Sequence, residues 1–199
     1  MKRLSLSLVV AVAVFAALPA AAQQAQMVRG VVSQIQPDRI TVTSKGGKPV
    51  VVDLSKDWRV SVTKPIGVAD IKPGSFIGTA EMPVSDGVGR SLEVHVFPPG
   101  VKMGEGHYAW DKKKGSMMTN GTVGNITVSK NGRELEVAYP GGQRKVVIPR
   151  NVPIVQISGG DRSLLKRGSA VFIVAAPKAG GGLITSSVAI GQSGSRPPM

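Results

Sequence analysis

Apolar and polar residues alternate in short stretches along most of the chain, which is the pattern of half-buried β-strands. Residues 40–42 and 50–52 show it clearly, because β-branched side chains take the alternate positions. Gly46 and Gly47 lie between these stretches and supply the positive φ that a tight hairpin turn needs. The same reasoning predicts further strands at 59–62, 76–81, 92–97, 153–157, 171–175 and 184–190. The sequence therefore predicts an all-β fold.

The second half of the chain repeats the first in the same order. Residues 40–60 match residues 135–155, so that the two double glycines coincide. Three shorter pairs of segments extend the match: GVVSQI with GTVGNI, DIKPGSFIG with SLLKRGSAVFI, and SLEVHVF with TSSVAIG. Four matched segments in constant order indicate an internal duplication, with copies at 28–97 and 118–191.

Each copy offers five or six short strands in about 70 residues, which is too few for a sandwich with two well-packed faces. A small closed barrel of the OB type fits this length and leaves no exposed sheet edge. A short helical turn closed by glycine is expected in each copy, at 68–75 and 162–169. Its apolar residues Ile71, Leu164 and Leu165 are expected to enter the core. The expected architecture is two tandem OB-like barrels, one in each copy.

The first 22 residues have the three parts of a cleavable secretion signal. Lys2 and Arg3 supply its positive start, and the apolar stretch 4–18 is shorter than the roughly 20 residues that a membrane span needs. Pro19 and three alanines follow, which fits cleavage before Gln23. An uncleaved membrane anchor is the alternative. No later stretch is long and apolar enough to span a bilayer, so we expect a soluble periplasmic or secreted protein.

Several motifs of the mature chain resemble an uncharacterised domain family of bacterial exported proteins with OB-like barrels. These are the G-x-V start of each copy, the glycine hairpin and the K-x-G segment before the last strands. The stretches EVHVFPPG, GEGHYAWD and MTNGTV and the C-terminal RPPM are similar to its double-barrel proteobacterial subgroup. The resemblance covers nearly the whole mature chain. It implies tandem OB-like barrels and brings no catalytic residues with it.

After cleavage the chain carries 23 basic and 12 acidic residues, a net charge of +11. This balance favours an anionic ligand or an envelope protein as partner, unless the basic residues only keep the chain soluble. Nucleic acid is the less favoured polyanion, because aromatic residues are few and Trp58 and Tyr139 occupy non-equivalent repeat positions. The absence of cysteine excludes disulfides, thiolate metal sites and thiol nucleophiles.

Residues 98–117 have no counterpart in the repeat and are rich in glycine and proline. A flexible linker would explain that composition, but the run GEGHYAWD gathers aromatic and charged side chains that linkers rarely contain. We therefore expect an ordered connection docked in the groove between the barrels, whereas the tail 192–199 is expected to be flexible. The residues predicted to form an interaction groove are Tyr108, Trp110, Lys112, Lys113 and Lys114.

Both histidines lie in or near this segment, which suggests a transition-metal site. Imidazole and carboxylate ligands suit zinc, nickel or copper. Their spacing matches no established metal motif, so the alternative is that both histidines only make structural hydrogen bonds. The candidate ligands are His95, Glu105, His107 and Asp111.

Catalytic motifs are absent apart from one chance match. Residues 61–64 fit the S-x-x-K pattern of penicillin-recognising enzymes but fall in a predicted strand instead of on a helix. We therefore expect a non-catalytic envelope protein that binds a polyanion or a protein partner. A periplasmic metal-binding protein with a site in the interdomain groove is the alternative, and the oligomeric state is left open.

Overall fold

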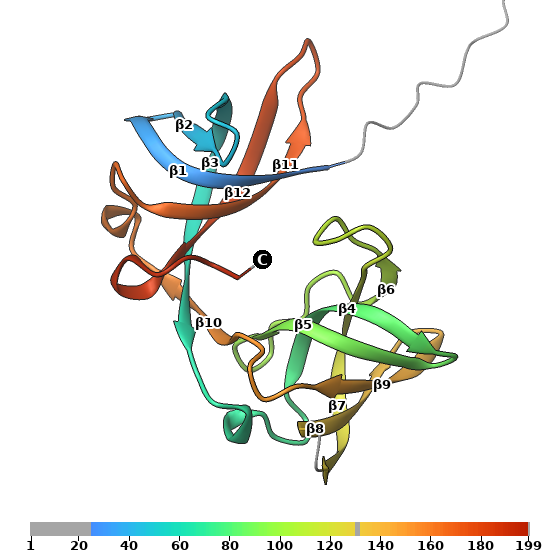
Figure 1. Ribbon diagram of the computed structural model, residues 1–199. Coiled ribbons are helices and arrows are strands. Elements are labelled where there is room, and N and C mark those ends of the chain that lie inside the picture. Colours follow the sequence, from blue (N-terminus) through green and yellow to red (C-terminus); the bar gives the residue numbers. More distant parts are fainter. Residues whose placement is uncertain (1–24, 130–131, 199) are drawn as a thin grey trace, which may run out of the picture.

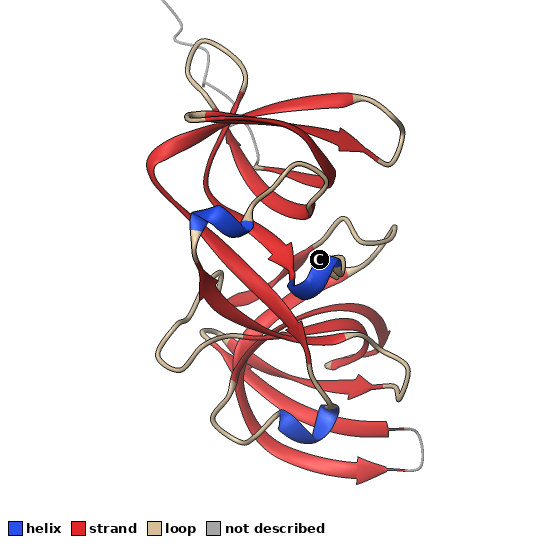
Figure 2. Cartoon of the chain, turned by 90° about the vertical axis from the view of Figure 1, so that its left-hand side faces the viewer, coloured by secondary structure: helices blue, strands red, loops and turns tan. Residues whose placement is uncertain are grey.

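The computed structural model describes residues 25–129 and 132–198, so the predicted signal at 1–22 lies outside the described residues. The fold is all-β, as predicted, and short 3₁₀ turns are the only helices in this part of the chain (Figure 1, Figure 2). None of the turns described is long and apolar enough to cross a membrane. The strands are β1 (Gln26–Gln36), β2 (Arg39–Ser44), β3 (Pro49–Pro65), β4 (Phe76–Ser85), β5 (Val88–Val96), β6 (Gly106–Ala109), β7 (Met117–Ser129), β8 (Gly132–Tyr139), β9 (Gly142–Ile148), β10 (Ile154–Gly160), β11 (Ala170–Pro177) and β12 (Leu183–Gly191). The 3₁₀ turns are η1 (Val68–Asp70), η2 (Arg162–Leu164) and η3 (Gln192–Gly194).

Five strands close into a barrel with mixed strand directions, at the top of Figure 1. They follow one another in the order β12-β11-β1-β2-β3, and β3 closes the ring by pairing in parallel with β12. Valine and isoleucine side chains from all five strands fill the interior, together with Trp58 and Leu165. The prediction that Leu164 also enters the core is wrong, because η2 turns only one of two adjacent leucines inward and leaves Leu164 48% exposed.

The barrel draws its strands from both copies of the repeat. β1, β2 and β3 belong to the first copy, whereas β11 and β12 belong to the second. This corrects the prediction that 28–97 and 118–191 each close a barrel of their own, because β11 and β12 take the places expected for β4 and β5. The physical reason is the length of β3, which runs for 17 residues without a turn and leads the chain out of the barrel before β4 begins (Figure 1).

The other seven strands include β4, β5, β7, β8 and β9, here called the second strand set, which surround a separate apolar core (Figure 1). They pair in the order β5-β4-β7-β8-β9. Three residue pairs, 88–90 with 145–147, join β5 to β9, and β10 pairs with β5 further along. β6 adds a short edge to β7.

The duplication is visible in the strand pairing as well as in the sequence. In the barrel, Gly30 pairs with Val171, Val171 with Ile190, and Ile190 with Val62. The equivalent residues of the second strand set and β10 pair in the same way: Gly121 with Ile77, Ile77 with Val96, and Val96 with Gln156. The single strand β3 of the first copy corresponds to two strands of the second copy, β9 and β10. Pro149 and Pro153 lie in the break between these two strands. Proline cannot donate a ladder hydrogen bond, which explains the break.

Two extended arms connect the barrel with the second strand set. β3 leaves the barrel and pairs antiparallel with β10, over 60–65 and 155–160. The chain thus passes down through β3 and returns through β10, as both views show (Figure 1, Figure 2). The C-terminal tail ends between the two units (Figure 1).

Candidate functional site

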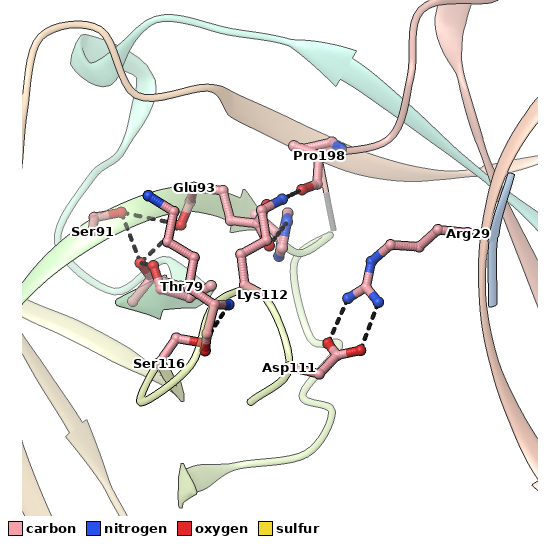
Figure 3. A network of polar contacts seen from close by, with 11 residues as sticks. Arg29, Thr79, Ser91, Glu93, Asp111, Lys112, Ser116 and Pro198 are labelled. Carbon is pink, nitrogen blue, oxygen red and sulfur yellow. Dashed lines mark hydrogen bonds and ion pairs between the residues drawn. The ribbon is translucent and has the colours of Figure 1, made fainter. Parts of the chain in front are cut away.

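The segment 98–117 packs between the barrel and the second strand set. Asp111 accepts two hydrogen bonds from the Arg29 guanidinium of β1, at 2.8 and 2.7 Å (Figure 3). The same guanidinium lies 4.9 Å from the centre of the Phe172 ring on β11, and the Trp110 ring approaches that phenylalanine at 6.5 Å. These contacts hold the segment against β1 and β11 of the barrel.

A buried acid–base cluster lies where this segment covers β5. It comprises Glu93, His95 and Lys112 and is called the Glu93 cluster. One carboxylate oxygen of the fully buried Glu93 accepts a hydrogen bond from Lys112 Nζ (Figure 3). The other, Oε1, has no hydrogen-bond partner among the described residues and lies 3.7 Å from His95 Nε2, which also has none. Lys112 Nζ donates in addition to the carbonyl of Pro198, so the tail that we expected to be flexible is held here.

Burial dominates the protonation of the Glu93 cluster. It raises the pKa of Glu93, although the hydrogen bond and the charge of Lys112 oppose the shift. Burial also lowers the pKa of His95 to about 3, with a smaller contribution of the same sign from the Lys112 charge. His95 is therefore neutral at pH 7, and Lys112 is the cation that balances Glu93.

A second cluster also combines a glutamate, a histidine and a basic side chain. This Glu81 cluster comprises Glu81 on β4, His107 on β6 and Arg144 on β9. Glu81 Oε1 accepts a hydrogen bond from Arg144 Nε, and His107 Nδ1 lies 3.8 Å from the same oxygen. His107 is held by a 2.8 Å hydrogen bond with Thr119 and by the stacked ring of Tyr139. Burial raises the pKa of Glu81 against the opposing effect of Arg144, and burial lowers the pKa of His107.

The Glu81 carboxylate occupies space that glycine leaves open. A β-carbon at Gly89 would lie 2.2–2.4 Å from the three carboxylate atoms of Glu81. Glu81 Oε2 has no hydrogen-bond partner within the described chain. Gly89 therefore provides room for the buried carboxylate, and Arg144 provides its countercharge.

Both glutamates are departures from the repeat. Where the first copy has Glu81 and Glu93, the second has Ala175 and Ser187. A buried ion pair contributes little net stability, so the fold itself does not explain these charges. The sequence analysis did not identify either glutamate. The signal that could have identified them is an acidic residue within a predicted strand at a position where the other copy has a small side chain.

The structure does not bring the four predicted metal ligands together. His95 pairs with Gly78 on β4. His107 pairs with Thr119 on β7, and Thr119 pairs with Thr79, the residue that follows Gly78 on β4. Consecutive residues of a strand point to opposite faces, so the two histidines lie on opposite sides of the sheet. Asp111 is engaged by Arg29, and Glu105 pairs with Lys102 at 3.7 Å. No three histidine, aspartate or glutamate residues in the described ranges are placed to hold a metal ion.

The predicted interaction groove is only partly available to a partner. Lys112 is bound to Glu93 and Pro198, and the Tyr108 hydroxyl donates to the Gly104 carbonyl at 3.2 Å while accepting from Asn120. Trp110 is half-buried against Phe172. Lys113 and Lys114 remain exposed.

The aromatic residues considered for base stacking are engaged inside the fold. Trp58 is buried in the barrel, beneath the guanidinium of Arg162, and Tyr139 stacks on His107. Three hollows of the described surface lie along β3 and β10, and none is lined by a residue of either cluster. The two buried clusters can therefore hold charge and protons, but they have no adjoining hollow among these three that would admit a substrate.

Protonation of His95 is expected to contribute to acid unfolding. The folded chain keeps His95 neutral down to a pKa of about 3, whereas the unfolded chain takes up this proton near 6.5. The folded state thus binds fewer protons between these values, and stability falls as the pH falls through this window. His95→Gln cannot take up the proton, so its urea midpoint should fall less than that of the parent between pH 7 and pH 4. Equal losses in both proteins would contradict this assignment.

Comparison of the sequence with models of protein families, with curated proteins and with solved structures finds no match. The resemblance to exported proteins with OB-like barrels therefore stays a prediction, and the chemistry of this chain's own residues carries the functional argument.

Proposed function

We propose that this protein is a non-catalytic exported module of two OB-like barrels that binds an anionic partner. The second barrel would be the second strand set, closed by the short pairing of β5 with β9 and continued by β10. Support comes from its own apolar core and from strand registers equivalent to those of the closed barrel. Export rests on the predicted signal at 1–22.

The observation that carries the binding proposal is a group of exposed cations around Met82, called the Met82 patch: Arg90, Lys113 and Lys114. Arg90 pairs across the hairpin with Met82. Lys113 and Lys114 precede Gly115, where a β-carbon would lie 3.9 Å from Met82 Cε. All three cations are exposed, and none has a carboxylate within 4 Å in the described structure.

The nearby carboxylates do not neutralise this patch. β4 and β5 carry Glu81 and Glu93, and both are fully buried and bound to Arg144 and Lys112. Both carboxylates are balanced by these buried or half-buried cations, so neither of them pairs with Arg90, Lys113 or Lys114. Clustered exposed cations attract anionic partners from solution, and this attraction weakens with added salt.

A paired charge removal tests this proposal. The double variant Lys113→Ala/Lys114→Ala is expected to elute from immobilised heparin at clearly lower salt than the parent, because two cations of the Met82 patch are lost. The matched control is Lys45→Ala/Lys48→Ala, which removes two exposed lysines from the β2–β3 hairpin of the barrel. The control should elute close to the parent. Equal shifts in both double variants, or retention that ignores salt, would contradict binding at the Met82 patch.

A further inference from the structure

A hollow of about 440 Å³ lies where β3, β10 and β12 meet η3. Small-molecule sites commonly have about 300–1,000 Å³. Val62, Leu164 and Ile190 give the hollow an apolar wall, and Lys64 brings a cation to it. This combination of apolar wall and single cation is separate from both buried clusters and from the Met82 patch.

The repeat explains why there is a hollow at this place. In the first copy Phe76 and Phe97 face each other edge to face, with ring centres 5.4 Å apart. The equivalent residues of the second copy are Ala170 and Gly191, and both line the hollow. The second copy therefore lacks two phenyl rings at the positions where the space occurs.

The two lost rings are compensated differently. At Gly191 the C-terminal tail crosses so closely that a β-carbon would lie 1.9 Å from the carbonyl oxygen of Ser195. Ala170, by contrast, presents only a methyl group where Phe76 presents a ring. The hollow thus lies beside the position where the first copy has the Phe76 ring, and Gln192 and Ser193 of η3 line one side of it.

The polar lining indicates the charge of the occupant. Lys64 is exposed on β3 and has no carboxylate within 4 Å in the described part of the chain. Ser158 and Ser193 add hydroxyl groups beside the hollow. Ser193 has φ 53°, a left-handed conformation that is uncommon outside glycine. Leu164, although apolar, is 48% exposed at this wall.

We propose that this hollow binds a small aromatic carboxylic acid. The ring lies against Leu164 and Val62, beside the Ala170 methyl group, and the carboxylate pairs with Lys64. One cation at the hollow matches one negative charge, and a single ring system matches the ring missing at Ala170, since the tail covers the other position, Gly191. This site does not depend on the Met82 patch.

The test is a titration of the chain with 2-naphthoate, followed by ligand-observed NMR and fluorescence. Ala170→Phe restores the ring of the first copy and is expected to abolish binding. Lys64→Gln should weaken binding about tenfold, the size of a lost hydrogen bond to a charged group. Lys48→Gln, an exposed lysine on the β2–β3 hairpin, is the matched control and should leave affinity unchanged.

Thermal unfolding of Ala170→Phe shows whether the variant is folded, and Lys64→Gln supplies an independent readout on an exposed side chain. The proposal is overturned if the parent shows no saturable binding at millimolar concentrations, or if folded Ala170→Phe binds as well as the parent. Equal affinity for the uncharged 2-naphthylmethanol would contradict the proposed pairing of the carboxylate with Lys64. Binding of phenylalanine-containing peptides without binding of naphthoate would overturn the small-molecule occupant.

Discussion

Replacing Gly30 by alanine is expected to destabilise the protein by about 3 kcal/mol, although it adds only one methyl group. A β-carbon at this position would lie 2.1 Å from the carbonyl oxygen of Thr43 on β2. That oxygen belongs to the backbone of the closed barrel, so it cannot move aside without disturbing strand pairing. Gly121, the equivalent residue, would clash in the same way, 2.4 Å from the carbonyl oxygen of Ala138. The glycine of the G-x-V motif is therefore required in each copy by a close approach of strands.

Urea unfolding followed by far-UV circular dichroism and by tryptophan fluorescence measures this effect, since Trp58 lies in the barrel core. Gly46→Ala is the matched control, because a β-carbon there would meet no atom within 4 Å. Its unfolding free energy should stay within about 0.5 kcal/mol of the parent. A Gly30→Ala midpoint equal to that of the control would contradict the close approach.

Local features of the fold could be predicted because local residues determine them. Gly47 and Gly141 have φ of 75° and 87°, at the two hairpins where double glycines were expected to supply positive φ. Alternation along the strand predicted at 92–97 puts Val94 and Val96 on one face, and both lie in the core of the second strand set. These predictions needed only side-chain chemistry and the period of a strand.

The exchange of strands between copies could not be predicted from the repeat. The same residue pairs form whether the last two strands of a barrel come from its own copy or from the other. The deciding feature is β3, in which neither glycine nor proline interrupts residues 50–64, so that the strand does not turn back. A long uninterrupted strand in only one of two copies is the signal that the sequence contains.

The candidate site was only partly predictable for a similar reason. The segment 98–117 differs from the rest of the mature chain because it lacks a counterpart in the repeat, and it supplies Lys112 and Asp111. Glu93 lies in the strand predicted at 92–97, on the face opposite Val94 and Val96. What buries that face comes from distant parts of the chain, including Lys112 and the tail at Pro198. Burial by distant segments leaves no periodic pattern in the sequence of the strand itself. An acidic residue in a strand is therefore predicted to be solvent-exposed.

Lys112→Met is expected to destabilise the protein by about 3 kcal/mol at pH 8, because it leaves the Glu93 carboxylate buried without its cation. Burial already raises the pKa of Glu93, and loss of the Lys112 charge raises it further. Between the ordinary carboxyl pKa and the raised one, the folded chain holds a proton that the unfolded chain has lost. Stability therefore falls as the pH rises through this window, and the loss in Lys112→Met should be smaller at pH 5 than at pH 8.

Urea unfolding of the variant at both pH values measures this effect, and Lys113→Met serves as the control because Lys113 is exposed and lies outside the Glu93 cluster. The control should change stability by no more than about 0.5 kcal/mol at either pH. Glu93→Gln/Lys112→Met removes both charges and should recover most of the loss at pH 8, since a neutral amide needs no countercharge. A double variant as unstable as Lys112→Met would mean that Lys112 acts by holding Pro198, and not by balancing Glu93.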